Sequence, residues 1–312
     1  MLAAIVIACA TVVLAAWAAS RGRASGREDA ATRRPVAASA TPFVQRDVVV
    51  SGLRLRYIDE GSGPPVVLIP GHTSRIEEYD RLTSLLRGRY RVLVFDFPGT
   101  GYSDKPVRAY DVRFYEDVLL GFLDALGVGR CYLAGGSLGG NLALRLAHRV
   151  PERFPRIAAW APGSAWEAMP LLAAFMRACR FGGLPFFWAT VRVQSTYWYA
   201  DDWPGKSRAL ADTFAYYREV LSPGFVRMYW GMAADQMGRS LFGIAPGIAQ
   251  PSLLMWGDRD HGLRMGDGVR RIHALMPRAE LAVLRGAGHA LAAERPEDVA
   301  AAVDEFFSRP QQ

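Results

Sequence analysis

The chain has 312 residues, of which 51% are hydrophobic and 21% are charged, and its formal net charge is +7. This length suffices for one large domain or two small ones with a buried core, and the composition excludes a disordered protein. Residues 1–44 carry +3 of the charge, from five Arg against two acidic residues, so the rest is too weakly basic for a nucleic-acid-binding surface. The spacing of Cys9, Cys131 and Cys179 indicates neither a metal site nor a disulfide scaffold. We expect no metal and no cofactor.

An uncharged apolar run fills residues 2–19, and five arginines follow it between Arg21 and Arg34. Its 18 residues are near the lower limit of a membrane span, about 17–25 residues. Positive charges on its C-terminal side favour a retained membrane anchor with the catalytic domain in the cytoplasm. The small-x-small motif at 16–18 leaves a cleaved signal, and a secreted or periplasmic protein, as the alternative. We therefore expect an apolar anchor or signal helix at 1–19 and a linker at 20–42.

The next segments alternate between strand and helix patterns. Two β-rich runs, Val44–Val50 and Leu53–Asp59, flank Ser51-Gly52 and predict an antiparallel hairpin. Short apolar runs that suit strands buried on both faces lie at 66–69, 92–95, 131–134, 157–161, 253–256 and 281–284. Helical periodicity occurs over 114–126, 138–150 and 299–307. The pattern predicts an α/β fold with a mostly parallel, doubly wound sheet.

One segment interrupts this alternation. Residues 163–249 are rich in Trp, Phe, Tyr and Met, as in Phe186–Trp188 and Tyr197–Tyr199. The strand pattern stops after Ala161 and resumes at Ser252. We therefore expect a helical lid at 163–249, inserted into a core formed by 43–162 and 250–310.

The run Gly135-Gly136-Ser137-Leu138-Gly139-Gly140 lies between an expected strand and an expected helix. This is the G-x-S-x-G arrangement of a nucleophile elbow. A sharp strand-to-helix turn strains the backbone of the serine, requires small neighbours and exposes the hydroxyl. The helix N-terminus and the Leu138 N–H then face developing negative charge. The motif predicts Ser137 as a nucleophile and Leu138 as an oxyanion-hole donor.

With this elbow, further motifs over residues 44–308 resemble the α/β-hydrolase family. The resemblance is to its lid-bearing branch of esterases, haloperoxidase-like enzymes and C–C bond hydrolases. Ile69-Pro70-Gly71-His72 follows the first parallel strand, where the family has His-Gly and then an oxyanion-hole residue. Pro70 stands in place of the family histidine, and the resemblance implies His72 as the second N–H donor. Asp96–Ser103 matches the family's D-x-P-G-x-G-x-S loop, which implies a bracing role for Asp96 and Ser103.

The fourth motif is an acid and a histidine near the C-terminus. In Gly257–Asp260 the resemblance implies Asp260 as the catalytic acid, with Asp258 bracing the turn. His289, in a glycine-bearing loop after the last expected strand, is the implied base. The order Ser137, Asp260, His289 is the order that α/β hydrolases use.

These residues predict a serine hydrolase that cleaves a carboxylic ester of an apolar small molecule through an acyl-enzyme. A Ser nucleophile in place of Asp disfavours dehalogenase and epoxide-hydrolase chemistry. Two alternatives stay open: C–C, amide or perhydrolase chemistry with the same triad, or a non-catalytic ligand-binding homologue. The expected partners are a small-molecule substrate and, through residues 2–19, a membrane, but no nucleic acid. The sequence assigns no oligomeric state.

Overall fold

The computed structural model describes residues 41–310. An eight-stranded sheet has the order β1-β2-β4-β3-β5-β6-β7-β8. The strands are β1 (Arg46–Val50), β2 (Leu53–Glu60), β3 (Pro65–Ile69), β4 (Arg91–Phe95), β5 (Tyr132–Gly136), β6 (Ile157–Trp160), β7 (Ser252–Gly257) and β8 (Ala279–Leu284). The β1–β2 and β2–β4 pairs are antiparallel, and the pairs from β4 to β8 are parallel. The expected α/β fold with a hairpin and a mostly parallel sheet is confirmed.

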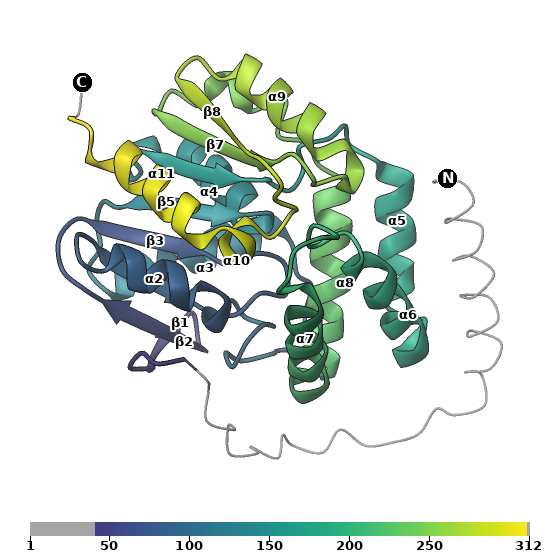
Figure 1. The fold of residues 1–312 in the computed structure, drawn as a ribbon. Helices are drawn as coiled ribbons and strands as arrows, with labels where there is room; N and C mark the ends of the chain where they lie inside the picture. The colour runs from purple at the N-terminus through teal and green to yellow at the C-terminus, as the bar shows by residue number, and fades with distance from the viewer. Residues whose placement is uncertain (1–40, 311–312) are drawn as a thin grey trace.

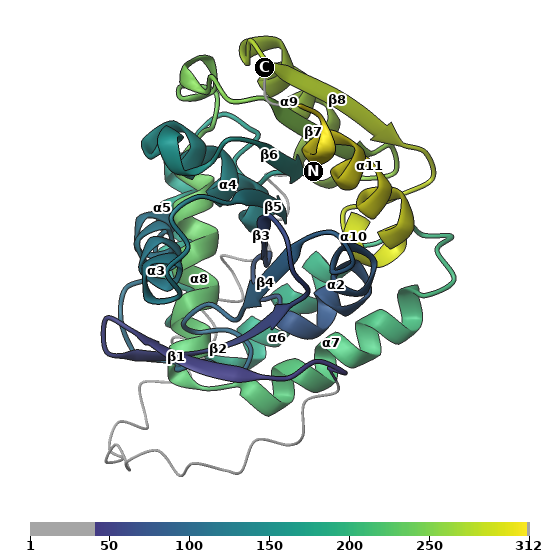
Figure 2. The same cartoon turned by 90° about the vertical axis from the view of Figure 1, so that its left-hand side faces the viewer.

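Helices cover both faces of the sheet (Figure 1). The helices of the core are α2 (Asp80–Leu86), α3 (Val112–Ala125), α4 (Leu138–Arg149), α9 (Met265–Leu275), α10 (Leu291–Glu294) and α11 (Pro296–Ser308), with the short 3-10 turns η1 (Ile76–Tyr79), η2 (Pro151–Arg153), η3 (Ala245–Gly247) and η4 (Gly262–Arg264). Apolar residues of α3, α4 and α9 share one hydrophobic core, and those of α2 and α11 share the other. Figure 2 shows these two helical layers on opposite sides of the strands.

The central strands contain continuous apolar runs because both of their faces are covered. Along β3, Val67 and Ile69 belong to the core under α4, whereas Val66 and Leu68 belong to the core under α2 and α11. All four side chains are fully buried. A strand in this position therefore shows a continuous apolar run instead of an alternating one.

Strand β8 departs from this expectation. It is the last strand of the sheet and pairs with β7 alone. Val283 is 43% exposed, and Glu280 is also exposed. The prediction that residues 281–284 are buried on both faces is wrong, because an edge strand next to solvent has one neighbour and incomplete cover.

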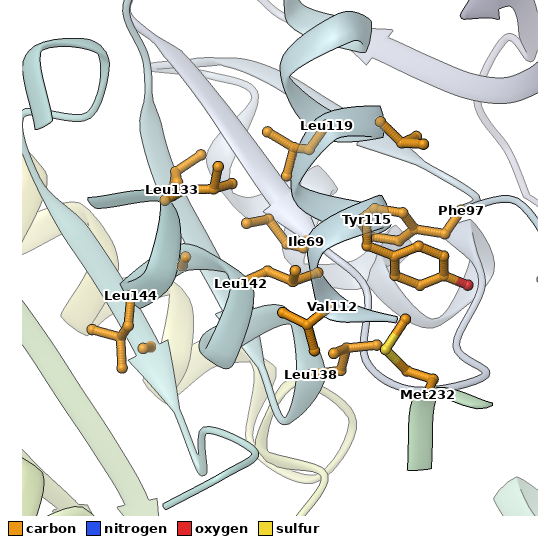
Figure 3. Close-up of a cluster of buried hydrophobic side chains, with 14 of the residues drawn as sticks. Ile69, Phe97, Val112, Tyr115, Leu119, Leu133, Leu138, Leu142, Leu144 and Met232 are labelled. Atoms are coloured by element: carbon orange, nitrogen blue, oxygen red, sulfur yellow. The ribbon is translucent and has the colours of Figure 1, made fainter. Parts of the chain in front are cut away.

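The packing of α4 fixes the position of the elbow. Leu138 and Leu142 of this helix are fully buried. They lie among Ile69 and Leu133 of the sheet, Val112, Tyr115 and Leu119 of α3, and Met232 (Figure 3). The N-terminus of α4 is thereby held at the carboxyl end of β5.

Between β6 and β7 the chain forms α5 (Pro170–Cys179), α6 (Gly183–Ser195), α7 (Lys206–Val220) and α8 (Pro223–Met237). These helices lie together at one side of the sheet (Figure 1). Aromatic contacts join α6 to α8: the Phe187 ring lies 5.0 Å from the Tyr229 ring and 6.0 Å from the Phe225 ring. Buried Phe225 and Met228 connect α8 to the core under α3.

The expected apolar helix at 1–19, and the linker up to residue 40, lie outside the described residues. Among residues 41–310, no helix is long and apolar enough to cross a membrane.

Candidate active site

Ser137 occupies the turn between β5 and α4. Its φ of 54° and ψ of −118° are strained for a residue with a side chain. The turn is also crowded: a Cβ at Gly135 would lie 2.7 Å from the Gly139 carbonyl carbon, and a Cβ at Gly139 would lie 2.0 Å from the Ile69 oxygen. Glycine on both sides therefore allows the sharp turn that the motif predicts, with Ser137 at the N-terminus of α4.

Asp260 and His289 meet at the same edge of the sheet. Asp260 follows β7 and His289 follows β8, and because these strands are parallel neighbours their carboxyl ends lie together. The His289 Nδ1 and Asp260 Oδ2 atoms are 2.7 Å apart. The Asp260 side chain is completely buried, and Gly262 N–H donates to its other oxygen at 3.1 Å. The carboxylate is thus held by two contacts and directed at the imidazole.

The carboxylate controls the charge of the imidazole. Burial alone would lower the pKa of His289, but the neighbouring Asp260 charge and hydrogen bond outweigh burial, so this pKa lies above 6.5. Asp258 has a different neighbour: its Oδ1 accepts a hydrogen bond from Gly286 N–H at 2.7 Å. This contact ties the loop after β7 to the loop after β8, as the bracing role of Asp258 predicts.

The loop after β3 lies against Ser137. A Cβ at Gly71 would lie 3.7 Å from Ser137 Cβ, so the backbone at His72 runs beside the serine. The His72 ring turns to the lid and stacks on Tyr229 with a centroid distance of 5.1 Å. Burial lowers the pKa of His72 to about 4, so its imidazole is neutral near pH 7. The His72 ring is thus engaged with Tyr229 of α8.

Asp96 is engaged in loop structure. Its Oδ2 accepts hydrogen bonds from Arg56 Nε and Tyr102 N–H, both at 2.7 Å, and its Oδ1 accepts one from Ile76 N–H at 3.0 Å. Ser103 Oγ donates to the Asp96 carbonyl at 2.6 Å. These contacts support the bracing role that the resemblance implies. Across residues 41–310, no group of three or more His, Cys, Asp or Glu side chains could hold a metal ion.

Glu294 is a residue beside the site that sequence reasoning missed. Its Oε2 accepts hydrogen bonds from Gly288 N–H at 2.9 Å and from Ala200 N–H at 3.2 Å. A second link joins the same segments, because Ala290 N–H donates to the Trp198 carbonyl at 3.0 Å. The lid is therefore fastened to the loop that carries His289, residues 285–290, which we call the histidine loop. The one signal in the sequence is a Glu shortly after the histidine, which no local pattern distinguishes from a surface residue.

Strand-to-helix turns with a serine at the tip characterise one class of doubly wound α/β proteins, the α/β hydrolases, and the turn at Ser137 puts this chain in that class. A family model described as "Alpha/beta hydrolase family" matches residues 66–302, more than half of the chain. The protein belongs to this family. Hydrolysis is the class of reaction that the membership supports.

Similar proteins carry several hydrolytic activities. Haloalkane dehalogenase 2 of Mycobacterium tuberculosis is 28% identical over 282 residues, which cover 85% of this chain and 96% of that protein. The 2-hydroxymuconate semialdehyde hydrolase of a Pseudomonas species is 35% identical over 136 residues, 42% of this chain and 47% of that one. Among solved structures, that of a membrane phospholipase A, a bacterial virulence factor, resembles this fold with a TM-score of 0.68. The two sequences are 27% identical, and the match covers 85% of this chain and 86% of that one.

Proposed function

We propose that this hydrolase cleaves carboxylic esters of apolar small molecules through an acyl-enzyme. The observation that carries the proposal is the strained Ser137 turn at the sheet edge where Asp260 and His289 form their 2.7 Å hydrogen bond. A serine hydroxyl is a poor nucleophile near neutral pH unless an adjacent base takes its proton. Ser137, His289 and Asp260 supply a nucleophile, a base and the group that orients the base.

In the proposed mechanism, His289 Nε2 accepts the Ser137 proton while Oγ attacks the ester carbonyl carbon. Asp260 accepts the Nδ1–H of His289, which turns Nε2 to the serine, and stabilises the imidazolium that forms. The N–H groups of Leu138 and His72 donate to the oxyanion, each contributing about 3–4 kcal/mol. The alcohol leaves with the proton from His289, and water then hydrolyses the acyl-enzyme by the same steps.

Two features support an ester with an apolar group. The lid over the site is built from aromatic side chains, and the His72 ring that faces it is uncharged near pH 7. Dehalogenase chemistry through an alkyl-enzyme ester uses an aspartate nucleophile, whereas this chain has Ser137. The nucleophile therefore favours ester hydrolysis over the reaction named for the mycobacterial relative.

A fluorophosphonate probe and a panel of p-nitrophenyl esters of varied chain length test the proposal. We expect the protein to be labelled and to turn over medium-chain esters, and Ser137→Ala to lower kcat on the order of 10⁶-fold. Ser84→Ala, at an exposed position of α2, is the matched control. Turnover by Ser137→Ala within tenfold of the unsubstituted protein would overturn the assignment. Labelling without turnover of any ester would favour a C–C or amide bond as the target.

A further inference from the structure

The loop after β3 makes a tight turn beside Ser137. Ser74 N–H donates to the Gly71 carbonyl at 3.2 Å, which closes a four-residue turn with His72 and Thr73 at its centre. A Cβ at Gly71 would lie 3.7 Å from Ser137 Cβ, so the turn starts next to the serine. The direction of the proposed oxyanion donor, His72 N–H, therefore depends on the conformation of this turn.

Thr73 holds the turn in a strained conformation. Its φ is 67°, and a positive φ at the third residue is typical of a type II turn, where glycine or asparagine is usual. A β-branched residue rarely adopts such a φ. Strain of this kind persists only where the surrounding contacts enforce it. The contacts of Thr73 therefore decide whether the turn keeps its shape.

These contacts come from the turn itself and from the lid. The Thr73 hydroxyl donates to the His72 carbonyl and shares a second hydrogen bond with the hydroxyl of Tyr217 in α7. Because the Thr73 proton is used in the first bond, the Tyr217 hydroxyl is the donor in the second. Thr73 is 4% exposed and Tyr217 is 1% exposed, so both hydroxyls are shielded from water. Helix α7 thereby reaches the His72 carbonyl through one side chain of the turn.

Tyr217 is itself held by the packing of the lid. The centre of its ring lies 5.3 Å from the centre of the Phe225 ring of α8. The neighbouring Tyr216 also reaches the core, but at another loop, because its hydroxyl accepts a hydrogen bond from Gly101 N–H at 2.6 Å. Adjacent tyrosines of α7 therefore bind two loops of the core, and the Tyr217 bond is the one made to the turn beside Ser137.

We propose that Tyr217 is a positioning residue of the oxyanion hole: through Thr73 it holds the turn in the conformation that presents His72 N–H to the substrate. This inference rests on the proposed ester hydrolysis and adds to it a lid residue that acts through the turn. An oxyanion-hole donor acts in the transition state, and loss of a whole donor lowers kcat about 10²–10³-fold. Removal of the Tyr217 hydroxyl displaces such a donor without deleting it, so the loss should be smaller.

Steady-state kinetics of Tyr217→Phe and Tyr216→Phe on a p-nitrophenyl ester provide the first test. Each substitution removes one buried hydroxyl that links α7 to the core, so Tyr216→Phe is the matched control. We expect Tyr217→Phe to lower kcat and kcat/KM equally, by about tenfold, as for an interaction made only in the transition state. Tyr216→Phe should lower Tm, because Gly101 N–H loses its acceptor, and should keep kcat within about twofold. Equal losses of kcat in the two folded variants, or no loss in Tyr217→Phe, would overturn the proposal.

A glycine at residue 73 separates positioning of the turn from a general effect on the lid. Glycine adopts a positive φ without strain, so Thr73→Gly should keep the turn without the bond to Tyr217. In that background Tyr217→Phe should change kcat by less than about twofold, whereas beside Thr73→Ser, which retains the hydroxyl, it should keep its full effect. A full effect of Tyr217→Phe beside Thr73→Gly would contradict the proposal.

The same variants are compared by their rates of fluorophosphonate labelling, because phosphonylation of Ser137 also develops negative charge on an oxygen. If the unsubstituted chain turns over no ester, the ester-hydrolase proposal fails, and the labelling rates then test the role of Tyr217 by themselves. A protein that is neither labelled nor active on any ester would overturn both proposals.

Discussion

The two aspartates after β7 illustrate how one turn separates two roles. Asp260 is buried and directed at His289, whereas Asp258 is partly open to solvent and holds Gly286. Both are carboxylates at the end of the same strand, so their residue type does not distinguish them. The two aspartates differ instead in their hydrogen-bond partners, which are His289 for Asp260 and Gly286 for Asp258.

We expect Asp260→Asn to lower kcat on the order of 10⁴-fold, because an amide no longer fixes the imidazole tautomer or stabilises the imidazolium. Asp258→Asn should keep kcat within tenfold and lower Tm, since it weakens only the contact with Gly286. Steady-state kinetics and thermal unfolding of both variants measure the two effects. The assignment of the acid is wrong if the Asp258 variant loses turnover while the Asp260 variant retains it.

We expect the raised pKa of His289 to show in the pH dependence of kcat/KM. The base must be neutral to accept the Ser137 proton, so kcat/KM should rise with pH through a midpoint above 6.5, the ordinary value for histidine. His72 should not contribute to this limb, because its pKa of about 4 leaves it neutral over the same range. A profile of kcat/KM from pH 5 to 9 tests this expectation, and a midpoint below 6.5 would contradict it.

Among the helices and strands, the sequence predicts best the strands that are buried on both faces, because full burial produces a continuous apolar run. Strands β3 to β7 are covered on both faces and have continuous apolar runs, whereas β8 has a similar apolar run but exposed residues, Glu280 and Val283, on its two faces. The one-turn helix α10 is too short to show a 3.6-residue period. The lid helices are apolar toward one another as well as toward the core, which hides their boundaries.

The candidate site also contains some residues that the sequence predicts and others that it does not. Ser137 is predictable because its turn is encoded by adjacent residues. The Asp260–His289 hydrogen bond depends on the pairing of β7 with β8, which the sequence suggests only through the family resemblance. Glu294 was not predicted, because one of its hydrogen-bond partners, Ala200, comes from the lid, which is distant in the chain.

The contact between the lid and the histidine loop provides a test at this scale. Glu294→Ala leaves the N–H groups of Gly288 and Ala200 without their acceptor, at a cost of about 1–3 kcal/mol for each buried group. We expect a lower Tm and a fall in kcat of at least tenfold, with partial rescue in Glu294→Gln, whose amide oxygen still accepts. The exposed Glu297→Ala is the control. Unchanged kcat in a folded Glu294→Ala protein would show that the link does not position His289.

At the scale of the whole molecule, the N-terminal apolar run bears on where the chain resides. The apolar run at 2–19 and the arginines after it lead us to propose a retained anchor with the catalytic domain in the cytoplasm. Intact-mass analysis of fractionated native protein should then find Met1–Gln312 in the membrane fraction after carbonate extraction. A soluble product that begins near Ala19 would end the anchor hypothesis.

The insertion of the lid between two paired strands also sets the order in which the enzyme is completed on the ribosome. Strand β6 ends at Trp160 and its neighbour β7 begins at Ser252, so this parallel pair must close a long loop before the sheet can be finished. Ser137 is translated before the lid, and Asp260 and His289 are translated after it. A nascent chain stalled within the lid would carry the proposed nucleophile, Ser137, without the proposed base, His289. We therefore expect the chain to react with a fluorophosphonate only after β7 and β8 have emerged from the exit tunnel.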